Sequence, residues 1–458
     1  MKTDIIILAA GKGTRMNSSL PKVLHRLAGK PLLQHVIDSA KSVDNANIVI
    51  VTGHGSEEVR AAISGNESKH QISYVVQNEQ LGTAHAVQMA VPNIGSGGTT
   101  LILYGDVPLI LPETIHEMLS AVSDNSMSLL TVELKDPAGY GRILRDESGH
   151  VTAIVEQKDA SAEQLKVNEV NTGVLALQTE HLKKWLPEIN NNNAQGEYYL
   201  TDLIALARAN DVSIETKQPR SVEEVEGVNN RLQLSCLERF YQKQQAENLM
   251  MAGVTLADPG RIDIRGNLSS GCDSFIDING VFEGNVTLGS NVFIGPNCLI
   301  IDSDIGDGVE IKANSVVEKS KIDTNAVIGP FARLRPGTVV GENAKVGNFV
   351  EIKNTKLGKS SKINHLSYVG DSELGDDVNV GAGTITCNYD GVNKHKTIIG
   401  DNSFIGSNTS LVAPVKIGKN ATVGAGSTIT KDIPDDQLGL TRAAQKTISD
   451  WQRPTKKS

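Results

Sequence analysis

Hydrophobic residues recur every six positions through the C-terminal half of the chain. Leu288, Ile294 and Ile300 are six residues apart, and the same spacing continues, with some five-residue steps, from Ile262 to Ile429. Many of these residues are followed by Gly, Asp or Asn. Neither an α-helix nor an ordinary strand has a period of six, which is typical of a parallel β-helix in which three hexads close one coil. The pattern therefore predicts a solenoid with a core of stacked aliphatic side chains.

The N-terminal half has a different pattern, in which short apolar runs alternate with amphipathic segments. The run at residues 4–8 is typical of a parallel strand buried on both faces. This alternation predicts a doubly wound, Rossmann-like α/β sheet whose ligand sits at the carboxyl ends of the strands. Further strands are expected at residues 48–51, 72–76 and 101–104, and helices at residues 32–41, 57–63, 82–89 and 114–122.

One long helix is expected between these two regions. The sequence from Asn230 to Gly253 carries charges throughout, and Gly253 ends it. We interpret this helix as a rigid arm. The expected organisation is an α/β domain at residues 1–229, a linker helix at residues 230–253, and a hexapeptide-repeat domain with a polar C-terminal tail at residues 254–458.

Composition narrows the choice of partners. The chain has 458 residues, more than one ordinary core, and a formal net charge of -9, which argues against nucleic acid or an anionic membrane as the main partner. No apolar run approaches the length of a membrane span. The four cysteines, Cys236, Cys272, Cys298 and Cys387, lack metal-ligand spacing. We therefore expect reduced thiols in a cytoplasmic protein.

The first strand leads into a glycine turn. Gly11-Lys12-Gly13 lacks the third glycine of the dinucleotide fingerprint and the ending of a P-loop. Its backbone N–H groups can approach phosphate oxygens, and Lys12, Arg15 and Lys22 add positive charge. From these residues alone, a phosphate site and a tight turn with solvated charges are equally good interpretations.

A longer string decides between these interpretations. The sequence Leu-Ala-Ala-Gly-x-Gly-Thr-Arg-Met at residues 8–16, with Pro21-Lys22 downstream, resembles the sugar-phosphate nucleotidyltransferases. The strings at residues 80–86 and 104–108 support this resemblance. Asp106 closes a strand, and a carboxylate at that position suits a Mg²⁺ ligand better than a helix cap.

The resemblance implies a set of contacts around a pyrimidine nucleotide, a sugar and a metal ion. Gln77, Gly82 and Thr83 would contact the pyrimidine, and Gly141, Glu156 and Asn171 would hold the sugar. Mg²⁺ would be held by Asp106 and Asn229. No protein nucleophile is needed, so His25, His35, His54 and His85 are expected to be structural or surface residues. The implied UTP and UDP-sugar contacts are Leu8, Ala9, Ala10, Gly11, Arg15, Lys22, Gln77, Gly82, Thr83, Tyr104, Gly141, Glu156, Asn171 and Asn229.

Two cations are in register on the predicted solenoid. Arg335 and Lys353 are eighteen residues apart, and each directly follows an inward aliphatic residue. They should lie one coil apart on one face, about 5 Å from each other. Like charges in this arrangement are unfavourable unless an anion sits between them. A phosphate site is therefore favoured over a solvated charged face.

Two further features lie near this pair. His365 taken alone is more often a packed or surface residue than a base, but beside a phosphate site it would suit proton removal from an amine. The rhythm also breaks at residues 387–396, which must project as a loop. Such insertions tend to build binding sites, although a neutral surface loop is the alternative. Cys387 at its base is interpreted as a packed thiol.

The whole chain resembles the bacterial bifunctional N-acetylglucosamine-1-phosphate uridyltransferases and glucosamine-1-phosphate N-acetyltransferases. The specific strings lie at residues 332–337, 346–353 and 381–391. The resemblance implies a left-handed β-helix, a homotrimer and acetyl-CoA bound between subunits. It makes His365 the catalytic base and Arg335, Lys353, Tyr368 and Asn379 the contacts of glucosamine 1-phosphate. The implied acetyl-CoA contacts are Ala382, Asn388, Tyr389, Ser407, Ala425 and Arg442.

The expected function is two successive reactions on one chain. The solenoid would acetylate glucosamine 1-phosphate, and the α/β domain would then transfer uridylyl from UTP to N-acetylglucosamine 1-phosphate, releasing pyrophosphate. The product, UDP-N-acetylglucosamine, feeds cell-wall and lipopolysaccharide precursor synthesis. Two alternatives stay open at this point. One is a nucleotidyltransferase whose repeats serve regulation or assembly, and the other is a trimeric scaffold that binds nucleotide sugars.

Overall fold

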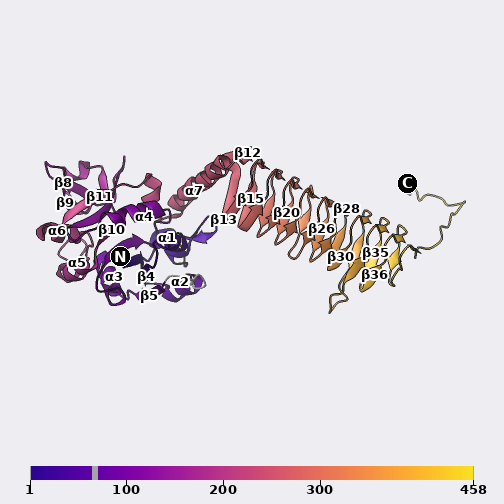
Figure 1. The fold of residues 1–458 in the computed structure, drawn as a ribbon, viewed down its shortest axis with the longest axis horizontal. Coiled ribbons are helices and arrows are strands. Elements are labelled where there is room, and N and C mark those ends of the chain that lie inside the picture. Colours follow the sequence, from indigo (N-terminus) through magenta and orange to yellow (C-terminus); the bar gives the residue numbers. More distant parts are fainter. Residues whose placement is uncertain (1, 64–70, 457–458) are drawn as a thin grey trace. The chain divides into compact units, whose positions relative to one another are not determined.

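The chain folds into two units, Met1–Tyr241 and Gln242–Ser458, in a computed structural model that describes residues 2–63 and 71–456 (Figure 1). The division between the units falls inside helix α7 (Arg231–Met251), where one long helix was expected. Each unit has a hydrophobic core of its own. In the described part of the chain, no helix combines the length and apolar character needed to cross a membrane.

The predicted strands form the parallel half of the sheet in the first unit. β1 (Thr3–Ala9) lies between β4 (Asn47–Thr52) and β6 (Thr99–Tyr104), and β5 (Gln71–Val76) pairs with β4. Beyond β6 the sheet becomes mixed, because β10 (Glu169–Gln178) runs antiparallel to β6. The other strands of this sheet are β7 (Ser126–Glu133), β8 (Arg142–Arg145), β9 (Val151–Val155) and β11 (Ser213–Lys217), whereas β2 (Arg26–Leu27) and β3 (Lys30–Pro31) form a separate two-stranded sheet.

Helices cover both faces of this sheet, as the doubly wound pattern predicts. Ile5 and Ile7 of β1 pack on one face, in a cluster with buried residues of α1, α2 and α4. Ile6 and Leu8 point to the opposite face and pack with α3, α5 and α6. A strand buried on both sides explains the apolar run at its sequence position. The helices are α1 (Leu32–Ala40), α2 (Ser56–Ile63), α3 (Thr83–Ala90), α4 (Pro112–Ser120), α5 (Thr179–Trp185) and α6 (Asp202–Ala209).

The second unit is the predicted parallel β-helix. Aliphatic residues one coil apart pair in register, as in Ile294 with Ile311, Ile328 and then Val346. The inward residues predicted from the period are buried, from Leu288 (2% exposed) to Ile429 (3% exposed). One sheet consists of β12 (Thr255–Leu256), β14 (Phe275–Ile276), β16 (Phe293–Ile294), β19 (Glu310–Ile311), β22 (Val327–Ile328), β25 (Lys345–Asn348), β28 (Lys362–His365), β31 (Asn379–Val380), β34 (Phe404–Ile405), β37 (Thr422–Val423) and β39 (Leu438–Gly439).

A second set of parallel strands completes each coil. It runs from β13 (Ile262–Ser270) and β15 (Gly280–Leu288) to β38 (Thr428–Ile429). The members that carry candidate site residues or flank the insertion are β23 (Arg333–Leu334), β26 (Glu351–Lys353), β29 (Tyr368–Gly370), β30 (Ser372–Leu374), β32 (Ile385–Cys387), β33 (Thr397–Ile399) and β35 (Ser410–Val412).

Asparagines at the corners of the coils adopt a left-handed backbone conformation. Asn279, Asn297 and Asn314 have φ values of 60°, 59° and 60°, in the left-handed region that asparagine tolerates. They also stack, because Asn279 Nδ2 donates to Asn297 Oδ1 over 2.9 Å and Asn297 Nδ2 donates to Asn314 Oδ1 over 3.2 Å. The same residue type therefore makes the turn and connects successive coils.

The break in the six-residue rhythm is a projecting hairpin (Figure 1). Leu374 of β30 pairs with Ile399 of β33, so the step between coils is longer here than elsewhere. Within the insertion, Tyr389 and Lys394 form an isolated antiparallel bridge. The predicted loop at residues 387–396 is thus confirmed, and the coil resumes in register after it.

Candidate functional sites

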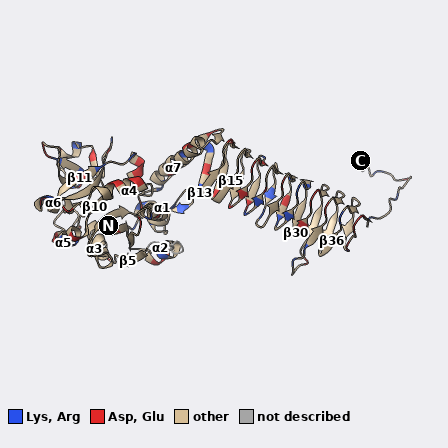
Figure 2. Cartoon of the chain, in the orientation of Figure 1, with Lys and Arg blue, Asp and Glu red and all other residues tan. Residues whose placement is uncertain are grey.

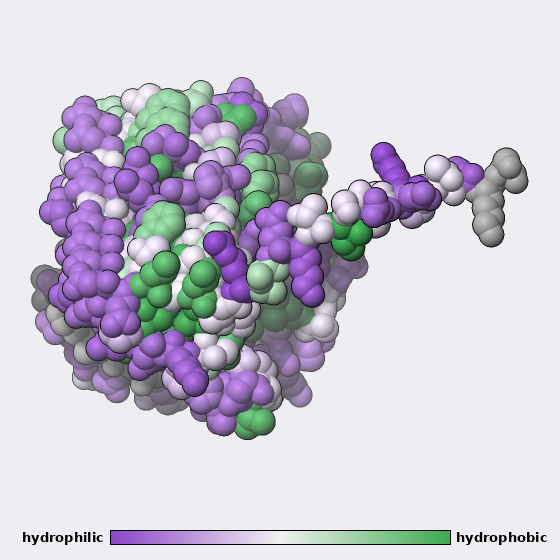
Figure 3. All heavy atoms as spheres, turned by 90° about the vertical axis from the view of Figure 1, so that its right-hand side faces the viewer, coloured by the Kyte–Doolittle hydropathy of each residue, from purple (hydrophilic) through white to green (hydrophobic). Residues whose placement is uncertain are grey.

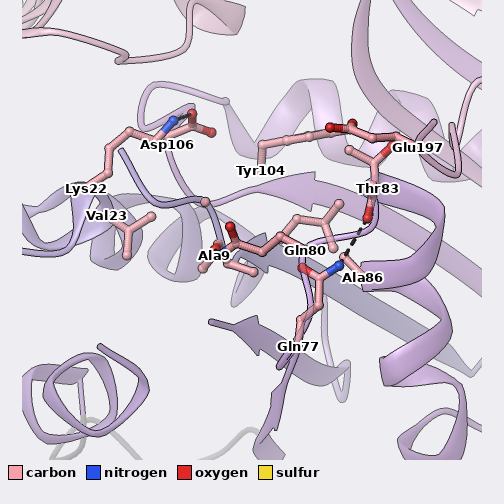
Figure 4. Close-up of a pocket in the computed structure, with 14 residues that line it drawn as sticks. Ala9, Lys22, Val23, Gln77, Gln80, Thr83, Ala86, Tyr104, Asp106 and Glu197 are labelled. Carbon is pink, nitrogen blue, oxygen red and sulfur yellow. Dashed lines mark hydrogen bonds and ion pairs between the residues drawn. The ribbon is translucent and has the colours of Figure 1, made fainter. Parts of the chain in front are cut away.

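A cavity of about 320 Å³ opens at the carboxyl ends of β1, β5 and β6 (Figure 4). The structure gathers ten of the predicted nucleotide-site residues there, including Asp106. Val23, Gln80, Ala86 and Glu197 also line the cavity and were not among the predicted contacts. The predicted residues in its wall are Leu8, Ala9, Ala10, Gly11, Lys22, Gln77, Gly82, Thr83, Tyr104 and Asp106.

The glycine turn brings Lys22 close to the end of β1. Gly13 has a φ of 61°, and a Cβ at this position would lie 2.6 Å from Cβ of Lys22. Any larger residue would therefore push Lys22 away from the cavity. On the other side of the turn, Gln80 Nε2 donates to the Ala10 carbonyl over 2.6 Å. The turn is held between these two side chains.

Gln77 is fixed in the floor of the cavity by its neighbours. It is 4% exposed, and its Nε2 lies 3.1 Å from the Gly82 carbonyl and 3.0 Å from His85 Nδ1. The Gly82 backbone lies so close to Tyr198 that a Cβ on Gly82 would be 2.5 Å from the Tyr198 carbonyl oxygen. When both N–H groups of the amide donate in this way, Oε1 is the atom of Gln77 that can accept a hydrogen bond from a ligand.

Oxygen ligands converge on a cation at the edge of the cavity. Lys22 Nζ forms an ion pair with Asp106 Oδ2 (Figure 4) and lies 3.4 Å from Asn229 Oδ1. Arg15 Nη2 donates to the same Asn229 oxygen over 2.8 Å. The described residues contain no group of three or more His, Cys, Asp or Glu arranged to hold a metal. One carboxylate and one amide oxygen, completed by phosphate oxygens, are nonetheless a donor set that suits Mg²⁺.

The three predicted sugar contacts lie together beside this cavity. The Asn171 N–H donates to the Gly141 carbonyl over 2.9 Å, and a Cβ on Gly141 would lie 3.3 Å from Glu156 Oε1. Burial raises the pKa of the Glu156 carboxyl. Burial and then the charges of Asp106 and Glu156 raise the pKa of the Tyr104 phenol. Tyr104 therefore lies within the electrostatic influence of both carboxylates, that of the predicted metal ligand Asp106 and that of the predicted sugar contact Glu156.

The second unit holds a cluster of cations on its middle coils, where Figure 2 shows Lys and Arg gathered between β15 and β30. The predicted neighbours Arg335 and Lys353 follow the paired residues Leu334 and Ile352, so they are in register. The pKa of Lys353 is held below its usual range. The largest cause is the nearby Lys394 of the hairpin, and desolvation and the charge of Arg335 contribute less. Arg335, Lys353 and Lys394 therefore form a cation cluster.

A cavity of about 430 Å³ adjoins this cluster and brings the hairpin against the coils. Lys394 lines it together with Asp371 and Asn354. Asp371 accepts hydrogen bonds from Asn354 and from the predicted contact Asn388. The hairpin and the coil surface thus form one polar hollow next to the cations.

His365 has a defined hydrogen-bond partner. It is exposed at the end of β28, and its Nδ1 lies 2.7 Å from Asn348 Oδ1 on the preceding coil. Because the amide oxygen is an acceptor, Nδ1 carries the proton and Nε2 keeps its lone pair. A neutral imidazole in this tautomer can act as a base at Nε2.

Several predicted acetyl-CoA contacts continue the column of His365. The register Ile363, Val380, Ile405, Val423 places residues two positions further on in line along the coil axis. Those residues are His365, Ala382, Ser407 and Ala425. Arg442 Nη1 donates to the Ala425 carbonyl over 3.0 Å, at the far end of the same column.

Within one copy, the predicted acetyl-transfer residues divide between the two sheets of the solenoid. Arg335 follows β23, and Lys353 and Tyr368 belong to β26 and β29 of the same sheet. His365 and Asn379 belong to the other sheet, in β28 and β31. Tyr389 lies on the hairpin and is 60% exposed.

The structure also adds residues that carried no assigned role. Asn348 could have been found from its spacing of seventeen residues before His365, which is one coil. Lys394 lies in the predicted loop, and Gln80 lies in the string that supported the resemblance. Nothing in the local sequence pattern marks Glu197, which enters the cavity from a segment without helix or strand.

Known families match both units. Residues 5–165 match the MobA-like NTP transferase domain, and residues 319–354 and 396–431 match the bacterial transferase hexapeptide (six repeats). Residues 285–319 match the hexapeptide repeat of succinyl-transferase. The chain therefore carries the signatures of two kinds of transferase.

Curated relatives extend these matches over the whole chain. Proteins named "Bifunctional protein GlmU" are 57% identical over 452 residues in Marinobacter nauticus, with 99% of each chain covered, and 58% identical over 455 residues in Cellvibrio japonicus, with 99% and 100% covered. The chain belongs to the GlmU family. A third GlmU protein, from Idiomarina loihiensis, is 55% identical over 457 residues and covers 100% of this chain and 99% of its own.

Membership of the GlmU family decides between the alternatives left open by the sequence. Relatives that match end to end are named bifunctional, and the chain has an NTP transferase domain as well as hexapeptide transferase repeats. A nucleotidyltransferase with purely regulatory repeats, or a scaffold without activity, does not fit these findings. The chain is a bifunctional transferase of the GlmU family.

Proposed function

We propose that the chain performs two successive transfers in the synthesis of UDP-N-acetylglucosamine. The β-helix transfers an acetyl group from acetyl-CoA to glucosamine 1-phosphate, and the first unit then transfers uridylyl from UTP to N-acetylglucosamine 1-phosphate. The observation that carries the proposal is that each unit places positive charge where an anionic substrate can bind: Lys22 beside Asp106 in the first, and Lys353 beside Lys394 in the second.

In the first unit, cations offset the repulsion between two polyanionic substrates. An oxygen of the sugar phosphate attacks the α-phosphorus of UTP, the new P–O bond forms, and the bond to pyrophosphate breaks. Lys22 and Arg15 bear positive charge at the edge of the cavity, where the phosphates enter. Stabilising charge on the transferred group and on pyrophosphate is the main catalytic demand, so no protein nucleophile is required.

The remaining residues of this unit select the base and the sugar. Gln77 Oε1 accepts the N–H of the uracil ring, because its amide nitrogen is already held by Gly82 and His85. Gly141, Glu156 and Asn171 hold the N-acetylglucosamine ring. The half-buried Glu156 carboxylate is stabilised by a sugar hydroxyl that donates to it.

Asp106 and Asn229 would hold Mg²⁺. Support for this site comes from the Lys22 ammonium, a cation that both oxygens already contact. When bound, Mg²⁺ supplies further neutralisation of phosphate oxygens. Lys22 contacts the same two oxygens. When the Asp106 and Asn229 oxygens hold Mg²⁺, the Lys22 ammonium would pair with a phosphate oxygen instead.

In the second unit, His365 removes a proton during acetyl transfer. The amino nitrogen of glucosamine 1-phosphate attacks the thioester carbonyl and forms the new C–N bond, Nε2 of His365 takes a proton from that nitrogen, and the C–S bond breaks so that coenzyme A leaves as its thiolate, which then takes up a proton. Asn348 stabilises the resulting imidazolium by accepting from Nδ1. Arg335, Lys353 and Lys394 hold the sugar phosphate, with Tyr368, Asn379, Asn388 and Tyr389 around the same substrate and the acetyl group.

The column beyond His365 suits an extended coenzyme. Ala382, Ser407 and Ala425 are small residues in line along the coil axis, so a pantetheine chain can lie against them. Arg442 at the end of the column bears a positive charge for the coenzyme phosphates. This arrangement leads the thioester towards His365.

An exposed apolar ladder supports assembly through the β-helix. Phe331 and Phe349 stack with their ring centroids 5.3 Å apart, and they are 50% and 56% exposed. Leu366 on the next coil is 64% exposed. The surface seen in Figure 3 is mostly hydrophilic, with hydrophobic patches between hydrophilic areas. Association of three copies would bury such patches, and it would let the residues on the two sheets of different copies complete one acetyl-transfer site.

Separate assays of the two half-reactions test this function. Asp106→Asn should lower uridylyl transfer from UTP to N-acetylglucosamine 1-phosphate by at least about a hundredfold and leave acetyl transfer unchanged. His365→Ala should give the reverse pattern, because general-base catalysis contributes about 10²–10⁴-fold. Loss of both activities in either variant, with the fold intact, would contradict the assignment of one reaction to each unit.

A further inference from the structure

The first turn of α7 contacts the segment that carries Asn229. Asn230 precedes the helix, and its Oδ1 accepts from the Gln233 N–H over 2.9 Å. The Gln233 side chain turns back, and its Oε1 accepts from the Asn229 N–H over 2.9 Å. This exchange is a variant of the capping box, in which the side chain at the third helical position normally bonds to the cap residue. Here it reaches one residue further, to Asn229.

The backbone before Asn229 is fixed at a second point. The Val228 N–H donates to the Asp106 carbonyl over 2.9 Å, so the chain at residues 227–229 runs beside the strand end that carries Asp106. The Asn229 Oδ1 faces Arg15 and Lys22 from this position. The N–H groups of Val228 and Asn229 therefore set the direction of the Asn229 side chain, the first by donating to the Asp106 carbonyl and the second by donating to Gln233 Oε1.

We propose that Gln233 is a positioning residue for uridylyl transfer. It holds the backbone of Asn229 so that the amide oxygen and the Asp106 carboxylate both face the Lys22 ammonium, and it touches neither substrate nor metal itself. The proposal rests on the proposed function, in which Asp106 and Asn229 hold the divalent cation. Gln233 lies within the first unit, and its contacts given above all lie there.

Binding of Mn²⁺ measures this role without relying on turnover. The full-length protein, saturated with UDP-N-acetylglucosamine, is titrated with Mn²⁺, and the free ion is followed by electron paramagnetic resonance. Gln233→Leu removes the acceptor and should weaken Mn²⁺ binding about two- to tenfold, the range for one hydrogen bond. Gln233→Glu keeps an acceptor and should bind Mn²⁺ within about twofold of the unmodified protein.

Kinetics then separate positioning from general damage. Gln233→Leu should raise the Mg²⁺ concentration for half-maximal uridylyl transfer by the factor seen with Mn²⁺, while kcat at saturating Mg²⁺ and acetyl transfer stay unchanged. Gln244→Leu, on the second half of α7, is the matched control and should alter none of these quantities. If Gln233→Leu does not fold, Gln233→Asn, which withdraws the amide by one carbon, replaces it.

The outcomes distinguish this inference from the proposed function. Unaltered Mn²⁺ binding in Gln233→Leu, or equal weakening in Gln233→Leu and Gln233→Glu, overturns the role of Gln233. Asn229→Ala serves as the reference variant. If Asn229→Ala binds Mn²⁺ as tightly as the unmodified protein, the assignment of the cation to Asp106 and Asn229 is wrong instead.

Discussion

Nδ1 of His365 lies 2.7 Å from Oδ1 of Asn348, one coil earlier in the β-helix. This contact fixes the tautomer of the imidazole and directs its unprotonated nitrogen away from Asn348. The same contact stabilises the imidazolium that forms when His365 takes a proton. Asn348 thus performs an orienting role, and in the sequence only its one-coil spacing from His365 indicates it.

Replacing Asn348 tests this relationship. Asn348→Ala should lower kcat for acetyl transfer about tenfold, because a hydrogen bond to a group that becomes charged contributes about 1.5–3 kcal/mol. The KM for glucosamine 1-phosphate should change little, since Asn348 contacts the imidazole and not the cation cluster. Steady-state kinetics of coenzyme A release provide the measurement. An unchanged kcat would show that His365 does not depend on Asn348.

The pKa of Lys353 predicts how glucosamine 1-phosphate binding changes with pH. Lys394, followed by desolvation and Arg335, lowers the pKa of Lys353, so its charge is lost at a lower pH than that of an ordinary lysine. The KM for glucosamine 1-phosphate should therefore rise in the alkaline range before pH 10.5, the ordinary lysine value. Lys394→Met removes the largest cause and should move this rise to higher pH.

The sign for stability follows from the same shift. Below the lowered pKa both states carry the charge and the folded protein bears the repulsion, which is relieved as the pH rises towards 10.5. Lys394→Met should lack this gain in stability on the alkaline side. Thermal unfolding of both proteins from pH 7 to pH 10.5 checks the stability prediction, and KM measured over the same range checks the binding prediction. The same pH dependence in the two proteins would contradict both.

The ionised Glu156 carboxylate should lower the stability of the fold but strengthen binding of the sugar. Burial raises the pKa of this carboxyl, so the ionised form costs stability above the raised pKa, and the cost disappears as the pH falls through it. Glu156→Gln should leave the melting temperature at pH 7.5 equal or higher. It should also raise the KM for N-acetylglucosamine 1-phosphate about tenfold, because a charged acceptor is lost.

The pH dependence provides the control for this prediction. On going from pH 7.5 to pH 5.5, the unmodified protein should gain stability relative to Glu156→Gln, since only the carboxyl can take up a proton. A lower melting temperature for Glu156→Gln at pH 7.5 would instead show that the ionised carboxylate stabilises the fold.

The fold was predictable wherever the spacing of hydrophobic residues, or an unbroken run of them, is set by the structure. The six-residue spacing identified the buried column, because a coil repeats the same environment at every turn, and Ile311, Val346 and Ile405 are fully buried. The apolar run of β1 identified a central strand. The antiparallel pairing of β10 with β6 was not foreseen, because strand order depends on long-range contacts that no local pattern records.

The sequence allowed most residues of the candidate sites to be predicted, but not all of the contacts between them. The glycine turn and Asp106 meet at one cavity because both end parallel strands at the same edge of the sheet. Asn348 and Lys394 were missed as site residues for a different reason. Their partners depend on which coil step has seventeen residues and on how the hairpin folds back, and neither is visible as a motif.

The most direct test of the account is product analysis by mass spectrometry. The purified protein is mixed with glucosamine 1-phosphate, acetyl-CoA, UTP and Mg²⁺, alongside a reaction without acetyl-CoA and one with the His365→Ala protein. The account predicts UDP-N-acetylglucosamine in the complete mixture alone, and its recovery in the His365→Ala reaction when N-acetylglucosamine 1-phosphate is added. If the unmodified protein also requires added N-acetylglucosamine 1-phosphate, the β-helix does not perform acetyl transfer and the central claim is wrong.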